Sequence, residues 1–240
     1  MADEAHNIAV FVDLENVVIG AREAGLKKFD FDVVLRRLVE KGNIVAKRAY
    51  ADWGHFAAQK RSLHEAAVEL IDIPASKASG KNSADIKMVV DALELAYTKP
   101  HIDVFALITG DSDFSPLVSK LRENNKHIIG VGVKRSTSSL LIDNCDEFIL
   151  YDDLIRAPAK RQSGGKLTKA PKLKQEAFQL LLDAVGALER EHRGAKWSSL
   201  VKDTMRRKQP QFNEEYHGYK SFSRLLEDAQ KHGLISLSKD

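Results

Sequence analysis

Aspartates at the ends of two apolar runs carry the strongest chemical signal in this sequence. Asp111 and Asp113 follow the run VFALITG, and Asp13 ends the run IAVFVD, with Asn16 three residues later. Charges at the end of a buried run are costly unless solvent, a cation or backbone N–H groups compensate them. A further aspartate, Asp85, falls in the first turn of a helical pattern. Acidic residues from three separate segments could thus contribute to one site.

Carboxylates from distant segments repel one another, and hard divalent cations with oxygen ligands are the usual compensation. We therefore expect Asp13, Asp111 and Asp113 to hold Mg²⁺ or Mn²⁺. The sequence has no cysteine or histidine cluster that would favour zinc. A cation of this kind activates water and neutralises phosphate, which is the chemistry of phosphodiester hydrolysis.

Neighbouring polar residues extend this hypothesis. Asn16 and Thr109 are predicted to orient a ligand or water, and Lys81 to meet a phosphate oxygen. Asp91 lies about 240° round the helix from Asp85, so both cannot face one site, and Asp85 is favoured. Each residue alone also has a structural explanation, as a turn, a first-turn helix charge or a solvated lysine. Because these residues are expected to lie together at one place, a functional site is favoured over the separate structural explanations.

The apolar patterns predict an α/β fold with a parallel sheet, because short apolar runs alternate with amphipathic stretches. The predicted strands are 8–13, 44–51, 68–73, 104–110, 127–133 and 148–152. The predicted helices of this part are 31–43, 55–67, 83–97 and 115–125. Ser115 is expected to be the N-cap of the last, with Pro116 at its first position. In the helix at 83–97, one side carries apolar residues, namely Ile86, Val89, Val90, Leu93 and Tyr97.

Open parallel sheets bind ligands outside the carboxyl ends of their strands, near the point where the strand order reverses. Asp13 and Asp111 follow two such strands, so we expect the acidic residues of the three segments to lie together at this edge.

Composition and charge bound the class of protein. With 43% hydrophobic and 30% charged residues in 240, the chain is globular in composition. No apolar run reaches the roughly 18 residues of a membrane span, and the first residues lack the pattern of a signal peptide. The single cysteine, Cys145, excludes an internal disulfide framework. These features predict a soluble cytoplasmic protein without a membrane partner.

The charge distribution predicts two domains and a tether. Residues 156–174 carry seven basic and no acidic side chains among Pro, Gly, Ser and Thr, which indicates a basic flexible linker or simply a soluble tether. Its expected counter-ion is a polyanion such as nucleic acid. Residues 1–155 then form the first domain. Residues 175–240 form a small winged-helix-like domain of three helices, at 175–191, 198–210 and 222–233, and a closing strand LISLS.

Three motifs of the first domain resemble the NYN domain family, a branch of the PIN-like metal-dependent ribonucleases. They are VFVDLENV, NSADIKMVVDAL and ITGDSDFSPLVSKLRENNKHIIGVG, and LLIDNCDEFILYDDL follows them. The resemblance implies a divalent-metal site and RNA as substrate. By motif position it implies that the catalytic residues are Asp13, Asp85, Asp111 and Asp113. Thr109 stands where many members have serine, which keeps the hydroxyl.

The second domain is similar to the OST-HTH or LOTUS domain through Trp197, QPQF, YKSFSRLLE and the closing apolar segment. This similarity implies RNA binding or, as in some animal members, a protein partner. Lys202, Arg206 and Arg207, with Lys208, are predicted to present a basic helix face to phosphates, and Tyr216 and Tyr219 to stack on bases. A solvated helix end explains the basic cluster equally well.

The sequence thus predicts a metal-dependent ribonuclease whose second domain holds RNA. The main alternative is a non-catalytic RNA-binding or adaptor protein. A phosphatase or nucleotide-binding protein is a further alternative, although the chain lacks a glycine-rich phosphate loop and Leu14 and Glu15 follow Asp13.

Overall fold

The structure is a computed structural model, and it describes residues 6–73, 83–156, 172–191 and 198–238. Contacts divide the chain into two compact units. One comprises Glu4–Leu38 and Gly42–Ala157, and the other comprises Met1–Asp3, Val39–Lys41 and Pro158–Asp240. Each unit has its own apolar core.

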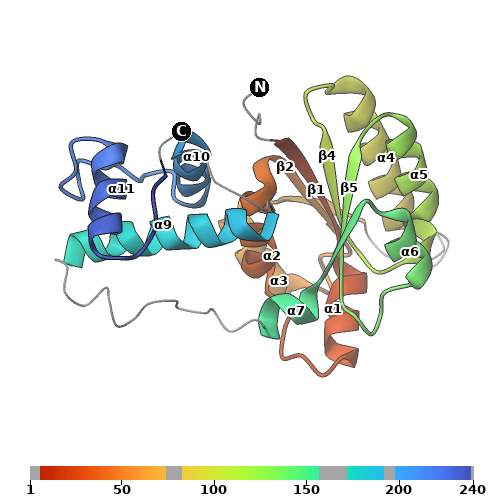
Figure 1. The fold of residues 1–240 in the computed structure, drawn as a ribbon. Coiled ribbons are helices and arrows are strands. Elements are labelled where there is room, and N and C mark those ends of the chain that lie inside the picture. Colours follow the sequence, from red (N-terminus) through yellow and green to blue (C-terminus); the bar gives the residue numbers. More distant parts are fainter. Residues whose placement is uncertain (1–5, 74–82, 157–171, 192–197, 239–240) are drawn as a thin grey trace. The chain divides into compact units, whose positions relative to one another are not determined.

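The first unit is built on a six-stranded sheet whose neighbouring strands are all parallel (Figure 1). The strand order is β3-β2-β1-β4-β5-β6. The strands are β1 (His6–Asp13), β2 (Gly42–Ala51), β3 (Glu69–Asp72), β4 (Val104–Ile108), β5 (His127–Gly132) and β6 (Glu147–Leu150). Every residue of β4 is buried, as expected for a central strand covered on both faces. The predicted α/β fold with a parallel sheet is confirmed.

Helices cover both faces of the sheet and create two apolar clusters (Figure 1). One cluster receives side chains from α1 (Leu14–Glu23), α2 (Phe31–Lys41), α3 (Ala57–Glu65) and α7 (Tyr151–Arg156). The other receives side chains from α4 (Ser83–Thr98), α5 (Ser115–Glu123) and α6 (Ser139–Asn144). A short 3₁₀ helix, η1 (Ser112–Phe114), precedes α5. Strand β1 supplies alternate residues to the two clusters, because side chains alternate along a strand.

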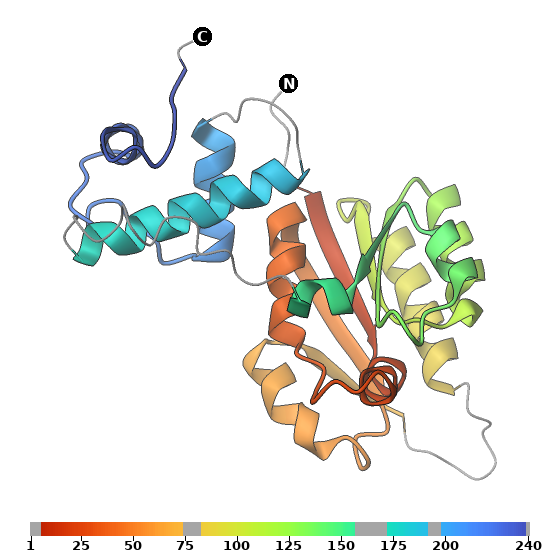
Figure 2. The same ribbon diagram turned by 60° about the horizontal axis from the view of Figure 1, so that its bottom comes forward.

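The strand order reverses between β1 and β4. From β1 the chain proceeds to β2 and β3 in one direction, whereas β4, β5 and β6 extend in the other. Val12 of β1 pairs with Ile108 of β4, so the residues that follow these two strands meet at one edge. Figure 2 shows α1 end-on at this edge, with the beginning of α4 on the same side. This is where the sequence predicted the acidic residues to gather.

Two local features differ from the sequence predictions. Ser115 is the first residue of α5 rather than its N-cap, because the 3₁₀ turn capped by Asp111 already leads the chain into the helix. Helix α4 buries Met88, Ala92 and Leu95 against the sheet, and of the apolar side identified in the sequence only Val89 and Leu93 pack, partly buried, against the same cluster. Ile86, Val90 and Tyr97 on that side are exposed.

The second unit contains three described helices, α9 (Lys172–Glu191), α10 (Ser198–Lys208) and α11 (Phe222–Lys231). Phe178, Met205 and Leu225 from the three helices meet in its core. The predicted closing strand LISLS does not form; residues 234–238 have no strand pairing. Among the helices of the described ranges, none has the length and apolar character of a membrane span.

Candidate active site

Asp13 ends β1 and begins α1, and its side chain is held on both oxygens. The residue is extended, and Oδ1 accepts a hydrogen bond of 3.2 Å from the backbone N–H of Asn16, which caps the helix. Oδ2 accepts a hydrogen bond of 3.0 Å from Oγ1 of Thr109, just beyond β4. Asp13 is only 8% exposed, so these contacts fix the orientation of a nearly buried carboxyl group.

Thr109 and Asn16 connect the ends of β1 and β4. Oγ1 of Thr109 also accepts a hydrogen bond of 3.2 Å from the backbone N–H of Asp111. Oδ1 of Asn16 accepts one of 2.8 Å from the backbone N–H of Gly110. Thr109 is fully buried, so it orients Asp13 and Asp111 and has no surface for the predicted contact with substrate. Asn16 is half-buried, and its side-chain oxygen is already engaged by the backbone N–H of Gly110.

Asp111 and Asp113 lie on the turn that follows β4. Oδ1 of Asp111 accepts a hydrogen bond of 2.9 Å from the backbone N–H of Asp113, which starts the 3₁₀ helix η1. The loop after β5 packs closely on this turn, because a Cβ at Gly110 would lie 2.6 Å from the backbone oxygen of Ser136. The turn thus holds two carboxylates beside a tightly packed backbone.

The charges of these carboxylates influence one another's pKa. Burial raises the pKa of Asp13 to about 7, and the charge of Asp85 adds to this against the hydrogen bond from Asn16. Burial also raises the pKa of Asp85, and the charges of Asp111 and Asp113 raise it further. The structure therefore brings together the four aspartates that the sequence analysis singled out. An added cation would relieve their repulsion.

Glu15 belongs to this acidic edge and was not singled out from the sequence. It lies in the first turn of α1, and its charge contributes to the raised pKa of Asp85. Its position two residues after Asp13 was the available signal.

The donors fit a hard cation in type, since all are carboxylate oxygens. Within the described ranges, however, no three histidine, cysteine, aspartate or glutamate side chains are grouped tightly enough to form a metal site. The acidic side chains therefore influence one another electrostatically without forming a compact ligand set.

Two residues considered in the sequence analysis lie outside this site. Asp91 is buried elsewhere, where it accepts hydrogen bonds of 2.9 Å from the hydroxyl of Tyr50 and 2.6 Å from Nζ of Lys87. Asp85, and not Asp91, therefore faces the acidic edge. Lys81 falls outside the described residues.

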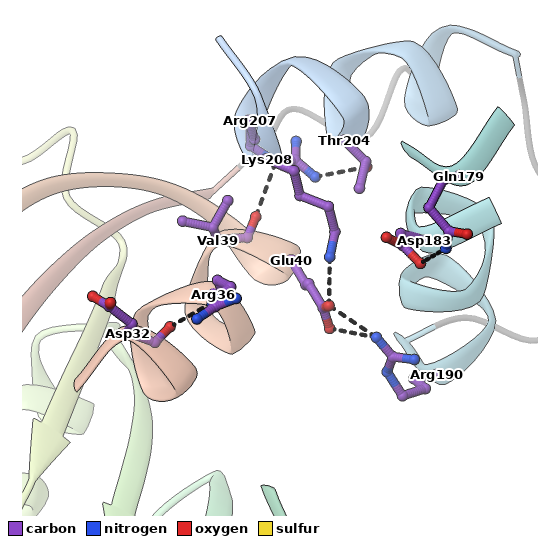
Figure 3. A network of polar contacts seen from close by, with 10 residues as sticks. All are labelled: Asp32, Arg36, Val39, Glu40, Gln179, Asp183, Arg190, Thr204, Arg207 and Lys208. Carbon is purple, nitrogen blue, oxygen red and sulfur yellow. Dashed lines mark hydrogen bonds and ion pairs between the residues drawn. The ribbon is translucent and has the colours of Figure 1, made fainter. Parts of the chain in front are cut away.

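The predicted basic face of the second unit is partly engaged within that unit. Lys202 forms an ion pair of 2.7 Å with Glu214. Figure 3 shows Arg207, which donates a hydrogen bond of 2.9 Å to Oγ1 of Thr204. Arg206 is exposed.

Further contacts of this unit concern Lys208 and the two tyrosines. Lys208 donates to Glu40 of the same unit at 2.6 Å (Figure 3). Tyr216 is 69% exposed, whereas Tyr219 is buried and donates to Asp228, so only Tyr216 presents its ring to solvent.

Comparison with known proteins places the first unit in a family. The sequence profile of the NYN domain matches residues 7–152, more than half of the chain. An uncharacterized protein of Methanocaldococcus jannaschii, MJ0482, is 29% identical over 171 residues, which cover 71% of this chain and 66% of that protein. The match thus spans just under two thirds of the relative.

A solved structure supports the fold. A protein of unknown function from Vibrio parahaemolyticus, VPA0982, superposes with a TM-score of 0.57 at 30% identity. The superposition covers 64% of this chain and 98% of that one.

Proposed function

The chain belongs to the NYN domain family, and from this premise we propose that it is a divalent-cation-dependent ribonuclease that hydrolyses phosphodiester bonds of RNA. NYN domains are PIN-like nuclease domains, so nuclease activity is what the family membership supports. RNA as the substrate and dependence on a cation are the steps that we add.

One observation carries the proposal: Asp13, Asp85, Asp111 and Asp113 come from three separate segments and share the edge where the strand order reverses. Burial and mutual repulsion raise the pKa of Asp13 to about 7, far above that of a solvated aspartate. Such an arrangement is costly for folding alone. Perturbed carboxyl groups gathered in this way are typical of functional sites.

Asp13, Asp111 and Asp113 are the residues that would hold Mg²⁺ or Mn²⁺, with Asp85 close enough to take part. When bound, the cation would lower the pKa of a water molecule and neutralise charge on the phosphate. The chain itself supplies orientation. Asn16 and Thr109 fix the carboxyl group of Asp13, and Thr109 also fixes the backbone at Asp111.

The proposal is tested by incubating the full chain with single-stranded and structured RNA, with and without Mg²⁺ or Mn²⁺. We expect cleavage that requires the cation and that an Asp111→Asn, Asp113→Asn double variant loses. Asp143→Asn, Asp153→Asn is a matched control, since it removes the same charge at two exposed positions of the same unit.

Three results would contradict the mechanism. Cleavage in the presence of EDTA would show that no cation is required. Cleavage by the Asp111→Asn, Asp113→Asn variant would show that these residues are not catalytic. Equal loss of cleavage in the control variant would show that the effect comes from net charge alone.

A second candidate, a non-catalytic RNA-binding or adaptor protein, is favoured by one observation. The acidic residues of the described ranges do not form a compact metal-binding group. Tight RNA binding by the wild-type chain, without cleavage of any RNA in either cation, would establish this alternative.

For the second unit we propose an OST-HTH-like role in holding RNA, with Arg206 and Tyr216 as the contacts. Both are exposed, whereas Lys202 and Arg207 already have partners within the unit. Arg206→Glu with Tyr216→Ala should weaken RNA binding and reduce its salt dependence. Unchanged RNA binding would leave a protein partner as the role of this unit.

A further inference from the structure

A pocket of about 690 Å³ opens beside the acidic edge of the first unit. This is within the range of about 300–1,000 Å³ that is typical of small-molecule sites. It lies among α4, η1, α5 and the beginning of α6. Its lining includes Asp85, Ile86, Val90, Asp113, Ser115 and Leu140.

The walls of the pocket are apolar although much of their surface is open to solvent. Ile86 is 62% exposed, Val90 52% and Leu140 54%. Large aliphatic side chains from two helices are therefore exposed around one cavity, and grouped apolar exposure is typical of binding surfaces. Ile86 and Val90, which belong to the apolar side of α4 and are not used by the core, thus line the pocket.

One polar group in the wall has no partner. Ser115 is only 8% exposed, and its Oγ has no hydrogen-bond partner among the described residues. Buried hydroxyl groups in native proteins are normally paired, so this one needs an explanation. The oxygen itself is buried, so this hydroxyl lies behind the pocket wall and is not an open contact for a ligand.

The pocket and the acidic edge are continuous, because Asp85 and Asp113 belong to both. We propose that the pocket receives one unpaired base of an RNA strand whose phosphodiester lies at the acidic edge. This inference rests on the proposed ribonuclease function and specifies its substrate as single-stranded RNA.

The chemistry of a base fits this pocket better than that of a phosphate. Two carboxylates at the rim repel an anionic group, whereas a base is neutral. The apolar walls suit its flat faces, and the carboxylates of Asp85 and Asp113 at the rim can accept hydrogen bonds from the polar edge of a base. In a duplex the bases are stacked and paired, and recognition of RNA bases therefore concentrates on single strands, loops and bulges.

The test compares a short oligouridylate with the same oligomer carrying one abasic nucleotide at successive positions. When the abasic nucleotide lies beside the cleaved bond, we expect the wild-type chain to cut the abasic oligomer about fivefold or more slowly than the intact one. The loss of one stacked base accounts for at least this factor. Equal rates at every abasic position would overturn the proposal without any variant.

Val90→Trp, which fills the pocket from a half-exposed position, should slow cleavage of the intact oligomer. The intact and abasic oligomers should then be cut at equal rates. Val45→Trp is the matched control, because Val45 is 47% exposed on β2, away from the pocket. Retention of the intact-to-abasic difference by Val90→Trp would contradict the proposal. If the wild-type chain proved dimeric and Val90→Trp monomeric, with the intact-to-abasic difference retained, this face would bind a second copy instead of a base.

Failure of the ribonuclease proposal can be separated from failure of this one. If the wild-type chain cuts neither oligomer, the equilibrium binding of both is measured by fluorescence anisotropy. Tighter binding of the intact oligomer, lost in Val90→Trp and kept in Val45→Trp, would support the pocket. Equal binding of both oligomers by the wild-type chain would overturn it.

Discussion

Thr109 donates a hydrogen bond of 3.0 Å to Asp13, and this contact joins the ends of the two strands between which the sheet reverses its order. The same hydroxyl oxygen accepts the backbone N–H of Asp111. A single buried side chain thus positions a carboxylate on β1 and the acidic turn after β4.

Replacing Thr109 with valine should impair activity more than folding. Valine has a similar shape but leaves Asp13 and the N–H of Asp111 each without one partner. Loss of an orienting partner behind a metal-binding residue typically costs about 10- to 100-fold in activity. We expect a loss of this size in the rate of RNA cleavage, with Thr109→Ser close to the wild type. Equal rates for valine and serine would show that the hydroxyl has no positioning role.

The sheet and its acidic edge could be predicted from the sequence because they depend on local patterns. Fully apolar runs separated by helical stretches predict buried parallel strands, and the aspartates follow two of these runs directly. Helix geometry predicts that Asp85 and Asp91 cannot both face one site, and the position of Asp85 nearer the loop favours it; the structure places the two residues in different surroundings.

Other features depend on packing between distant segments. Helix α1 follows β1 without a linker, so the sequence shows one continuous segment. Ala92 and Ala96 of α4 face the core together with Met88 and Leu95, while the aliphatic side chains of Ile86 and Val90 are exposed. Neither the partnerless hydroxyl of Ser115 nor the pocket beside it has a sequence signature.

The separate environment of Asp91 gives a second prediction. Asp91→Asn should cut RNA at a rate within about twofold of the wild type, whereas Asp85→Asn should lose at least about tenfold. Asp91→Ala should lower the free energy of unfolding by about 1–3 kcal/mol, because the buried hydroxyl of Tyr50 loses its acceptor. Cleavage assays and urea unfolding measure the two effects. Loss of cleavage in a stably folded Asp91→Asn variant would place this residue in the site.

Cys145 should react slowly with thiol reagents in the folded protein. Burial, with a contribution from Asp146, raises its pKa to about 11. The thiolate is the reactive form, so its fraction at pH 8 should be about a hundredfold lower than in the unfolded chain. The reaction rate with a disulfide reagent should therefore rise steeply between pH 8 and about 11. A fast reaction at pH 8 in the native protein would contradict the shift.

Two glycines are expected to respond to alanine with opposite sign. At Gly186 in α9 the added Cβ meets nothing closer than 3.9 Å, so the substitution should stabilise the second unit by about 0.5–1 kcal/mol through helix propensity.

At Gly110 the Cβ would lie 2.6 Å from a backbone oxygen and 2.9 Å from Cα of Thr137. The backbone there must shift, so Gly110→Ala should both destabilise the first unit and slow RNA cleavage. Thermal unfolding of both variants measures the two signs, and a stabilised Gly110→Ala variant with full cleavage would show that the acidic turn tolerates displacement.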